Sequence, residues 1–233
     1  MRTLKIALAQ AAALGALFLV STSPALALEL PDVHVLSSET YPVVGEGSVE
    51  GAEVVALETE LGEFLPPPGS KLSIAWELTE LSSAGPMTIM LSGVQEPKSK
   101  TTCNTSGDPA GTVKFTGEYH VVDTSIAPLT AALLVSFKEL VVECNSGKLK
   151  IKIRGPVVVK LTKVTSGTEV TEFGLQVKCS GKGKQELKEY LTDEGKGTKA
   201  VLTENLGLGF ESACENVREE VVVSATKMLD FLF

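Results

Sequence analysis

Four basic residues at alternate positions form the sequence feature whose spacing most clearly suggests a binding surface. Apolar residues at positions 149, 151 and 153 alternate with Lys148, Lys150, Lys152 and Arg154, which we call the basic stripe. Because successive side chains of a β-strand point to opposite faces, the four cations share one face and lie about 6.6–7 Å apart. They could bind an anionic polymer of the cell envelope or an acidic protein surface. The same pattern fits a solvated face, or a sheet edge that lysines protect from aggregation, and this plainer interpretation is favoured.

The four cysteines could form two disulfide bonds. They are Cys103, Cys144, Cys179 and Cys214. An even number of cysteines in an exported chain argues for a disulfide framework, and four cysteines allow three pairings. We expect Cys103–Cys144 and Cys179–Cys214 because these bridges close loops of similar size, and each could stabilise the fold by about 2–4 kcal/mol. No two cysteines have the C-x-x-C spacing, so a metal site is not expected.

Residues that could act in catalysis are few. The two histidines, His34 and His120, have no recognisable nucleophile near them, and the sequence contains no G-x-S-x-G. A carboxylate pair could hydrolyse a glycosidic bond. The candidates lie towards the C-terminus: Asp193, Glu194, Glu211, Glu215, Glu219 and Glu220. A solubilising surface is the favoured interpretation of these carboxylates, and no phosphate-binding or dinucleotide motif is present, so no cofactor is expected.

An exposed row of aromatic rings would indicate a carbohydrate-binding module. The Trp and Tyr candidates are Tyr41, Trp76, Tyr119 and Tyr190. Trp76 falls within an alternating apolar pattern, so it is expected to anchor the core with its N–H bonded to the backbone, rather than to serve as a ligand platform.

The first 27 residues have the pattern of a targeting segment. Arg2 and Lys5 precede an apolar run at 6–20, and a helix-breaking stretch at 21–24 precedes Ala25-Leu26-Ala27. This pattern predicts a signal peptide cleaved after Ala27. An uncleaved anchor is the alternative, but the run is short against the ~20 residues of a membrane helix. No second stretch is long and apolar enough, so we expect a mature chain without a transmembrane segment, secreted or associated with the cell envelope.

The distribution of charge and proline suggests two parts in the mature chain. The formal net charge is −8, which makes nucleic acid a poor partner. Between positions 29 and 96 the only cation is Lys71, against twelve carboxylates. Pro66-Pro67-Pro68 cannot join a central sheet. We therefore expect an acidic N-terminal arm or edge strands over 28–69 and a main domain over 70–233. The oligomeric state is left open.

Apolar residues alternate with polar ones through most of the main domain. The pattern is clear over 71–81, 113–121, 149–154 and 170–179, and Asn145-Ser146-Gly147 supplies the residues of a tight hairpin turn. Many short strands separated by glycine turns are typical of sandwiches and barrels. The sequence therefore predicts an all-β fold: an antiparallel β-sandwich or a jelly-roll-like barrel of many short strands, stabilised by disulfides.

Part of the chain resembles a group of secreted proteins. Cys103-Asn104-Thr105-Ser106-Gly107, then Gly111-Thr112-Val113, then Cys144 followed by 147–151, is similar to uncharacterised secreted proteins of high-GC Gram-positive bacteria over roughly residues 91–161. The resemblance implies export and a β-sandwich, and it brings no activity with it. Gly93-Val94 stands where the pattern has Gly-Cys, so no disulfide pairing is carried over.

The function expected from these patterns is a secreted or envelope-associated, non-catalytic protein with a structural or binding role. The alternative is a secreted glycoside hydrolase or a carbohydrate-binding module.

Overall fold

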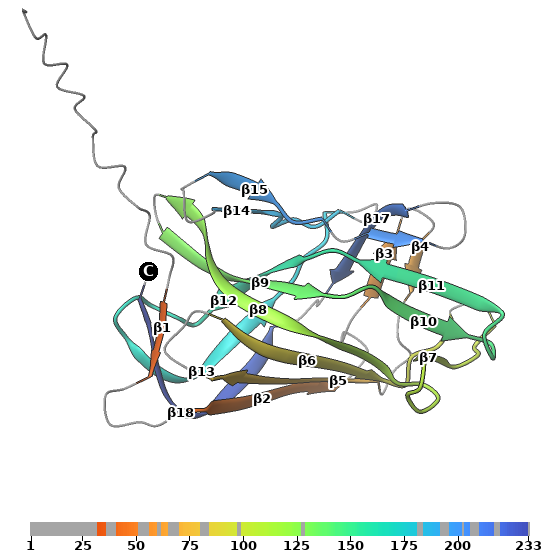
Figure 1. Ribbon diagram of the computed structural model, residues 1–233, viewed down its shortest axis with the longest axis horizontal. Coiled ribbons are helices and arrows are strands. Elements are labelled where there is room, and N and C mark those ends of the chain that lie inside the picture. The colour runs from red at the N-terminus through yellow and green to blue at the C-terminus, as the bar shows by residue number, and fades with distance from the viewer. Residues whose placement is uncertain are drawn as a thin grey trace, which may run out of the picture.

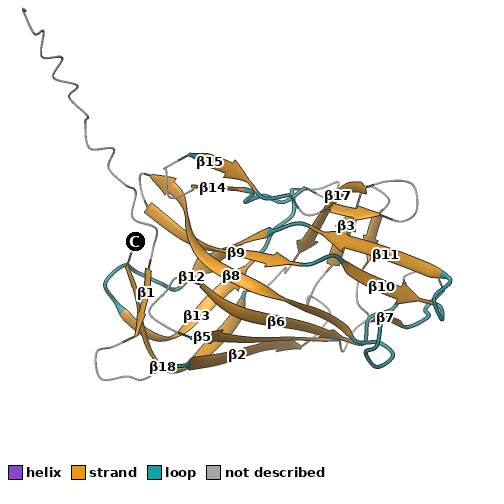
Figure 2. Cartoon of the chain, viewed as in Figure 1, coloured by secondary structure: helices purple, strands orange, loops and turns teal. Residues whose placement is uncertain are grey.

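The computed structural model describes most of the chain beyond the N-terminal segment. The described residues are 32–35, 41–50, 56–59, 62–64, 70–79, 84–96, 99–126, 129–180, 184–191, 196–201, 203–205, 210–216 and 220–232. They form strands, turns and loops, without a helix in any of these ranges (Figure 2). The same ranges accordingly hold no helix that could cross a membrane. The predicted signal peptide at 1–27 lies outside them.

Eight antiparallel strands close into a barrel (Figure 1). In chain order they are β2 (Val43–Glu50), β5 (Lys71–Leu78), β6 (Ala84–Ser92), β8 (Val113–Ile126), β9 (Leu129–Phe137), β12 (Val157–Thr162), β13 (Glu169–Gln176) and β18 (Val221–Leu232). Each strand pairs with the next, and β18 returns to β2 through the pair Val223 and Gly47. The all-β, antiparallel fold predicted from the sequence is confirmed. Neighbours in the barrel follow one another in chain order, so the connectivity is up-and-down rather than that of a jelly roll.

The predicted alternation explains how these strands build the barrel wall. Along β5, Leu72, Ile74, Trp76 and Leu78 are buried, while the residues between them are exposed or half-buried. The other strands contribute inward side chains in the same way, and these form one buried apolar cluster. A closed barrel leaves no free edge among its own strands. The remaining strand β1 (Asp32–Val35) pairs with the end of β18.

Seven further strands form a second sheet at one end of the barrel, which we call the crown. They are β3 (Ala56–Thr59), β4 (Gly62–Phe64), β7 (Cys103–Thr105), β10 (Leu140–Cys144), β11 (Leu149–Arg154), β16 (Thr203–Asn205) and β17 (Phe210–Asn216). Because barrel strands alternate in direction, the four long connections β2–β5, β6–β8, β9–β12 and β13–β18 leave from the same end. Pairing of β3 with β17, β16 with β11, and β10 with β7 joins all four connections into one sheet.

A small hairpin from the fourth connection folds back along the barrel. Its strands are β14 (Glu189–Leu191) and β15 (Gly197–Lys199), which lie over β8 and β9 in Figure 1. This segment, residues 184–200, is called the flap. Ala200 of the flap forms a second buried cluster with Val122, Ala132 and Val158 of the barrel wall. The flap therefore covers apolar residues on the outer wall of the barrel, which water would otherwise contact.

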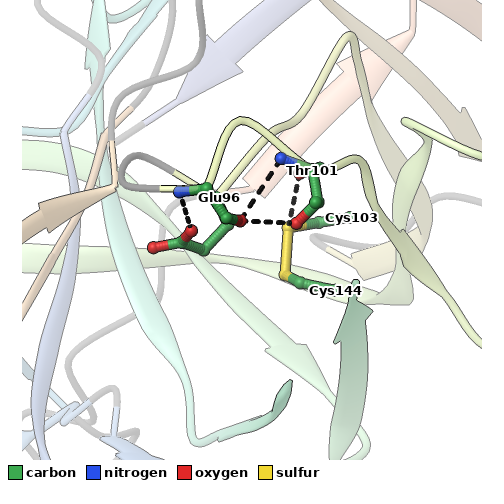
Figure 3. The surroundings of a disulfide bond; sticks show 5 residues. Glu96, Thr101, Cys103 and Cys144 are labelled. Carbon is green, nitrogen blue, oxygen red and sulfur yellow. Dashed lines mark hydrogen bonds between the residues drawn. A yellow bond between two sulfur atoms is a disulfide. The ribbon is translucent and has the colours of Figure 1, made fainter. Parts of the chain in front are cut away.

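Both predicted disulfides are confirmed. Cys103 and Cys144 lie opposite each other on β7 and β10, so this bridge joins the second and third connections within the crown. Figure 3 shows it beside the turn at 96–101, where the carbonyl of Thr101 accepts a hydrogen bond from the N–H of Glu96 at 2.9 Å. Cys179–Cys214 ties the segment that follows β13 to β17. The predicted turn is also confirmed, because Asn145, Ser146 and Gly147 all have positive φ.

Residues 43–50 correct the expectation of an acidic arm or edge strands over 28–69. β2 pairs with β5 along its whole length and with β18 at positions 45–47, so it lies inside the barrel wall. Glycines such as Gly45 and Gly47 within a strand pattern are typical of an edge strand, but a Cβ atom at Gly47 would lie 2.6 Å from the carbonyl oxygen of Val222. The glycines are there because neighbouring strands approach closely.

Candidate functional site

Aromatic and aliphatic side chains fill the interior of the barrel. Trp76 packs edge-on against Tyr119, with ring centroids 6.2 Å apart, and at a tilt against Phe173, at 5.7 Å. Phe173 in turn contacts Phe231. The cavity left among them has a volume of about 10 Å³. That is room for about one water molecule, so the interior is a packed core and not a ligand chamber.

Two of the four aromatic residues considered for sugar binding lie in this core. Trp76 and Tyr119 are 6% and 3% exposed, so neither can belong to a surface platform. The hydroxyl of Tyr119 donates to the carbonyl of Glu77 at 3.2 Å, and burial, followed by the nearby Glu77 carboxylate, raises the pKa of Tyr119. Trp76 is the core anchor that was expected. Its N–H, however, has no hydrogen-bond partner among the described residues, contrary to the expectation.

A pocket of about 460 Å³ lies on the outer wall of the barrel, beside the flap. We call it the wall pocket. Its apolar lining consists of Ala131, Val158, Leu161, Val164 and Leu187. Its polar lining consists of Thr124, Thr130, Lys160, Gln176, Lys178 and Glu186. The volume is within the range of about 300–1,000 Å³ that is usual for small-molecule sites, and the mixture of an apolar surface with a few polar groups is also typical of them.

The positions of the polar groups follow from the register of β12 and β13. Lys160 lies directly opposite Gln176. Lys178 follows the end of β13 by two residues, and its side chain lines the pocket together with that of Gln176. Thr124 on β8 and Thr130 on β9 lie at another part of the rim, where their hydroxyl oxygens are 2.7 Å apart. Four strands of the barrel, β8, β9, β12 and β13, thus fix most of the polar groups in place.

The flap wall of the pocket is anchored by hydrogen bonds. The side-chain amide of Gln185 is buried and donates from Nε2 to the carbonyl of Val158 at 3.2 Å. Cys179 and Gln185 form a β-bridge, and the N–H of Glu186 donates to the carbonyl of Lys178 at 2.8 Å. Because Cys179 is also bonded to Cys214, the disulfide holds the start of the segment that carries Glu186 and Leu187.

Asp123 is a buried carboxyl on β8, next to a strand that lines the wall pocket. It is 1% exposed and lies opposite Ala131, a residue of the pocket lining. Neither carboxyl oxygen has a hydrogen-bond partner among the described residues. Desolvation disfavours the charged form, so burial raises the pKa of Asp123. Ionisation of Asp123 is therefore expected to change the stability of the barrel with pH.

The basic stripe lies on the exposed face of β11, as the alternation predicted. Lys150 forms a salt bridge with Glu143 at 2.8 Å, and Lys152 forms one with Glu139 at 3.0 Å. Carboxylates from the adjoining β10 and from the turn before it therefore offset part of the positive charge. The stripe is not a simple sheet edge, because positions 152–154 also pair with β16. An anionic partner for the stripe remains a prediction.

The candidate catalytic residues are not brought together in the described part of the chain. His120 is exposed on β8, and His34 belongs to β1. Glu220 forms a salt bridge with Lys163 at 2.5 Å. Asp193, Glu194 and Glu219 lie outside the described residues, and Glu211 and Glu215 are placed only as members of β17. The described residues contain no cluster of three or more His, Cys, Asp or Glu side chains suited to a metal.

A second hollow, of about 610 Å³, lies over β2, β5, β6 and β18. Val44, Ala75 and Pro86 contribute to its lining, together with Glu46 and Glu77. It is more open than the wall pocket, which the flap borders through Glu186 and Leu187. The wall pocket is therefore the better candidate site among the described residues.

Sequence reasoning missed the wall pocket, although one signal for it is present. The run Val157-Val158-Val159 is apolar at three consecutive positions, and all three residues are buried. A strand that is apolar on both faces must be covered on both faces. The run thus indicates a cover on the outer wall, although it does not identify which segment provides it.

No protein-family model, curated protein or solved structure matches the chain.

Proposed function

We propose that this chain is an exported, disulfide-stabilised barrel protein that binds a small ligand in the wall pocket without transforming it chemically. The observation that carries the proposal is the pocket itself, about 460 Å³ in volume, with an apolar lining and hydrogen-bond donors on a rigid barrel wall. Burial of apolar ligand surface supplies affinity, and a few fixed polar groups select the ligand.

Export is supported by two independent features. Two disulfides between four cysteines are typical of proteins that fold in an oxidising compartment. The N-terminal 27 residues have the sequence pattern of a signal peptide. Secretion or association with the cell envelope is the location in which such a binding protein would meet its ligand.

A pocket-blocking variant tests the proposal. Gln176 is half-buried and lines the pocket, so Gln176→Phe places a ring in the space that a ligand would occupy. Thr116→Phe is the matched control, because Thr116 is exposed on β8 and belongs to neither hollow. The probe is N-phenyl-1-naphthylamine, a neutral apolar dye whose fluorescence rises when it leaves water.

The wild type and Thr116→Phe are expected to bind the dye with the same Kd. Gln176→Phe is expected to raise the Kd by about tenfold or more, equivalent to about 1.4 kcal/mol. Circular dichroism and Trp76 fluorescence check that both variants fold. Equal binding by all three proteins would contradict the proposal, and so would the absence of dye binding by the wild type.

A further inference from the structure

We infer that the wall pocket selects a small organic anion with an apolar body, and that Lys160 and Lys178 bind its anionic group. The inference rests on the proposed function, because it names the class of ligand for the same pocket. It is carried by the charge state of the rim, by the positions of the two lysines, and by the apolar surface next to them.

The two lysines have no carboxylate partner among the described residues, in contrast to four other lysines. Four lysines, at positions 150, 152, 163 and 199, form salt bridges with glutamates at 2.5–3.7 Å. Neither Lys160 nor Lys178 forms a salt bridge with any carboxylate that the structure describes. Their ammonium groups can therefore bind a ligand without first giving up a protein partner.

The backbone places the two ammonium groups so that they can meet one ligand group. Lys160 is opposite Gln176, the last residue of β13, and Lys178 follows Gln176 by two residues, so the two lysines are placed much as diagonal neighbours on adjacent strands are. Diagonal neighbours on one sheet face are about 7–8 Å apart, within reach of long side chains. A carboxylate or sulfonate between them could accept a hydrogen bond from each, and bonds between charged groups are the stronger ones.

The balance of charge at the rim favours a ligand with a single negative charge. Two lysines and one glutamate, Glu186, line the pocket, which leaves one net positive charge there. The whole chain has a formal net charge of −8. A locally positive pocket on an acidic protein attracts small anions to this site.

The apolar lining requires more of the ligand than a charge. Val158 and Leu187 lie beside the lysines and belong to the pocket surface. An inorganic anion would leave this surface in contact with water, whereas an apolar body would cover it. A neutral apolar molecule would leave the ammonium groups without a partner. Only an amphipathic anion uses both parts of the pocket.

Two dyes that differ only in one charged group test the inference. N-phenyl-1-naphthylamine is neutral, and 8-anilinonaphthalene-1-sulfonate carries a sulfonate on the same ring system. Each is titrated against the wild type, Lys160→Gln/Lys178→Gln and Lys150→Gln/Lys152→Gln. The second double variant is the matched control, because it removes the same charge from the exposed basic stripe, outside the wall pocket.

The ratio of the two Kd values is the quantity to compare. We expect the wild type to bind the sulfonate more tightly, and Lys160→Gln/Lys178→Gln to reduce this preference by about tenfold. Lys150→Gln/Lys152→Gln should keep the wild-type preference. An unchanged preference in the pocket variant, or an equal loss in the stripe variant, would overturn the inference.

The outcome also separates this inference from the proposed function. If Gln176→Phe weakens both dyes while the lysine variants leave the preference unchanged, the pocket binds ligands and only the assignment of an anion fails. If the wild type binds neither dye, or if Gln176→Phe weakens neither, the proposed function fails and the inference fails with it.

Discussion

Gly45 lies directly opposite Trp76 in the pairing of β2 with β5, and a Cβ atom at Gly45 would be 2.3 Å from Nε1 of the indole. The same Cβ atom would lie 2.5 Å from the carbonyl oxygen of Ser224 on β18. Neither distance is compatible with a side chain. Trp76 therefore fills the space that a side chain on β2 would otherwise take, at the point where β2 closes the barrel against β18.

Replacement of this glycine is expected to destabilise the barrel. Gly45→Ala forces the indole or the β18 backbone to move, and overpacking of a well-packed core typically costs about 1–3 kcal/mol. The loss is measured as a lower urea midpoint, followed by the fluorescence of Trp76, the only tryptophan. Gly197→Ala is the control, because a Cβ atom there would have no neighbour within 4 Å. A Gly45→Ala protein as stable as Gly197→Ala would contradict the packing described here.

The two disulfides are expected to contribute similarly to stability. They span 41 and 35 residues, and a loop-entropy model assigns each about 4 kcal/mol through the unfolded state. Cys103→Ser/Cys144→Ser and Cys179→Ser/Cys214→Ser should therefore lower the free energy of unfolding by comparable amounts, as measured in urea. A large difference between the two variants would show that one bridge acts mainly on the folded state.

The same two variants are expected to differ in ligand binding. Cys179 adjoins Lys178 and forms a β-bridge with Gln185, so its bond to Cys214 holds the flap side of the wall pocket. Loss of this bridge should raise the Kd for the sulfonate dye by about tenfold, measured where both variants remain folded. Loss of Cys103–Cys144, which lies in the crown, should leave that Kd unchanged. The reverse order would contradict the role given to the flap.

The buried carboxyl of Asp123 predicts a specific dependence of stability on pH. Burial raises its pKa in the folded state, so the folded protein holds the proton more tightly than the unfolded chain does. Stability is therefore lost as the pH rises from the unfolded pKa of about 3.9 through the folded value. Asp123→Asn removes this loss, because the amide does not ionise.

Asp123→Asn is thus expected to be more stable than the wild type at pH 8, where the wild-type carboxyl is ionised in the unfolded chain and burial opposes its ionisation in the folded protein. The advantage should shrink as the pH falls towards about 4. Urea unfolding at both pH values measures it, with Glu118→Gln as the control because Glu118 is exposed on the same strand. An advantage of the same size at both pH values would rule out ionisation of Asp123 as its cause.

Local patterns predicted the strands and the hairpin turn of this protein. Leu72, Ile74 and Trp76 are spaced two apart, and burial of alternate residues requires only that one face of the sheet meets the core. Asn145-Ser146-Gly147 tolerate positive φ, so they also mark their turn locally. The disulfide pairing was predicted from loop lengths, which are a property of the sequence as well.

Features that depend on distant segments were not predictable in the same way. Gly45 and Gly47 resembled an edge strand, because nothing in their neighbourhood reveals that Trp76 and β18 approach them. The crown was not foreseen, since its pairs join connections that are far apart in the chain. The wall pocket combines Lys160 and Lys178 with a flap that returns from the fourth connection. Only the apolar run at 157–159 pointed to that cover.

The most direct test of the central claim is to locate a bound anion on the protein by solution NMR. Isotope-labelled wild-type protein is titrated with octanoate, and backbone amide shifts are followed to saturation. The largest shifts are expected at Val158, Lys160, Gln176, Lys178 and Leu187, which line the wall pocket. Octan-1-ol, which lacks the charge, should produce smaller shifts at the same amides. Shifts centred instead on Val44, Glu46 and Ala75 of the other hollow, or spread evenly over the barrel, would contradict the account.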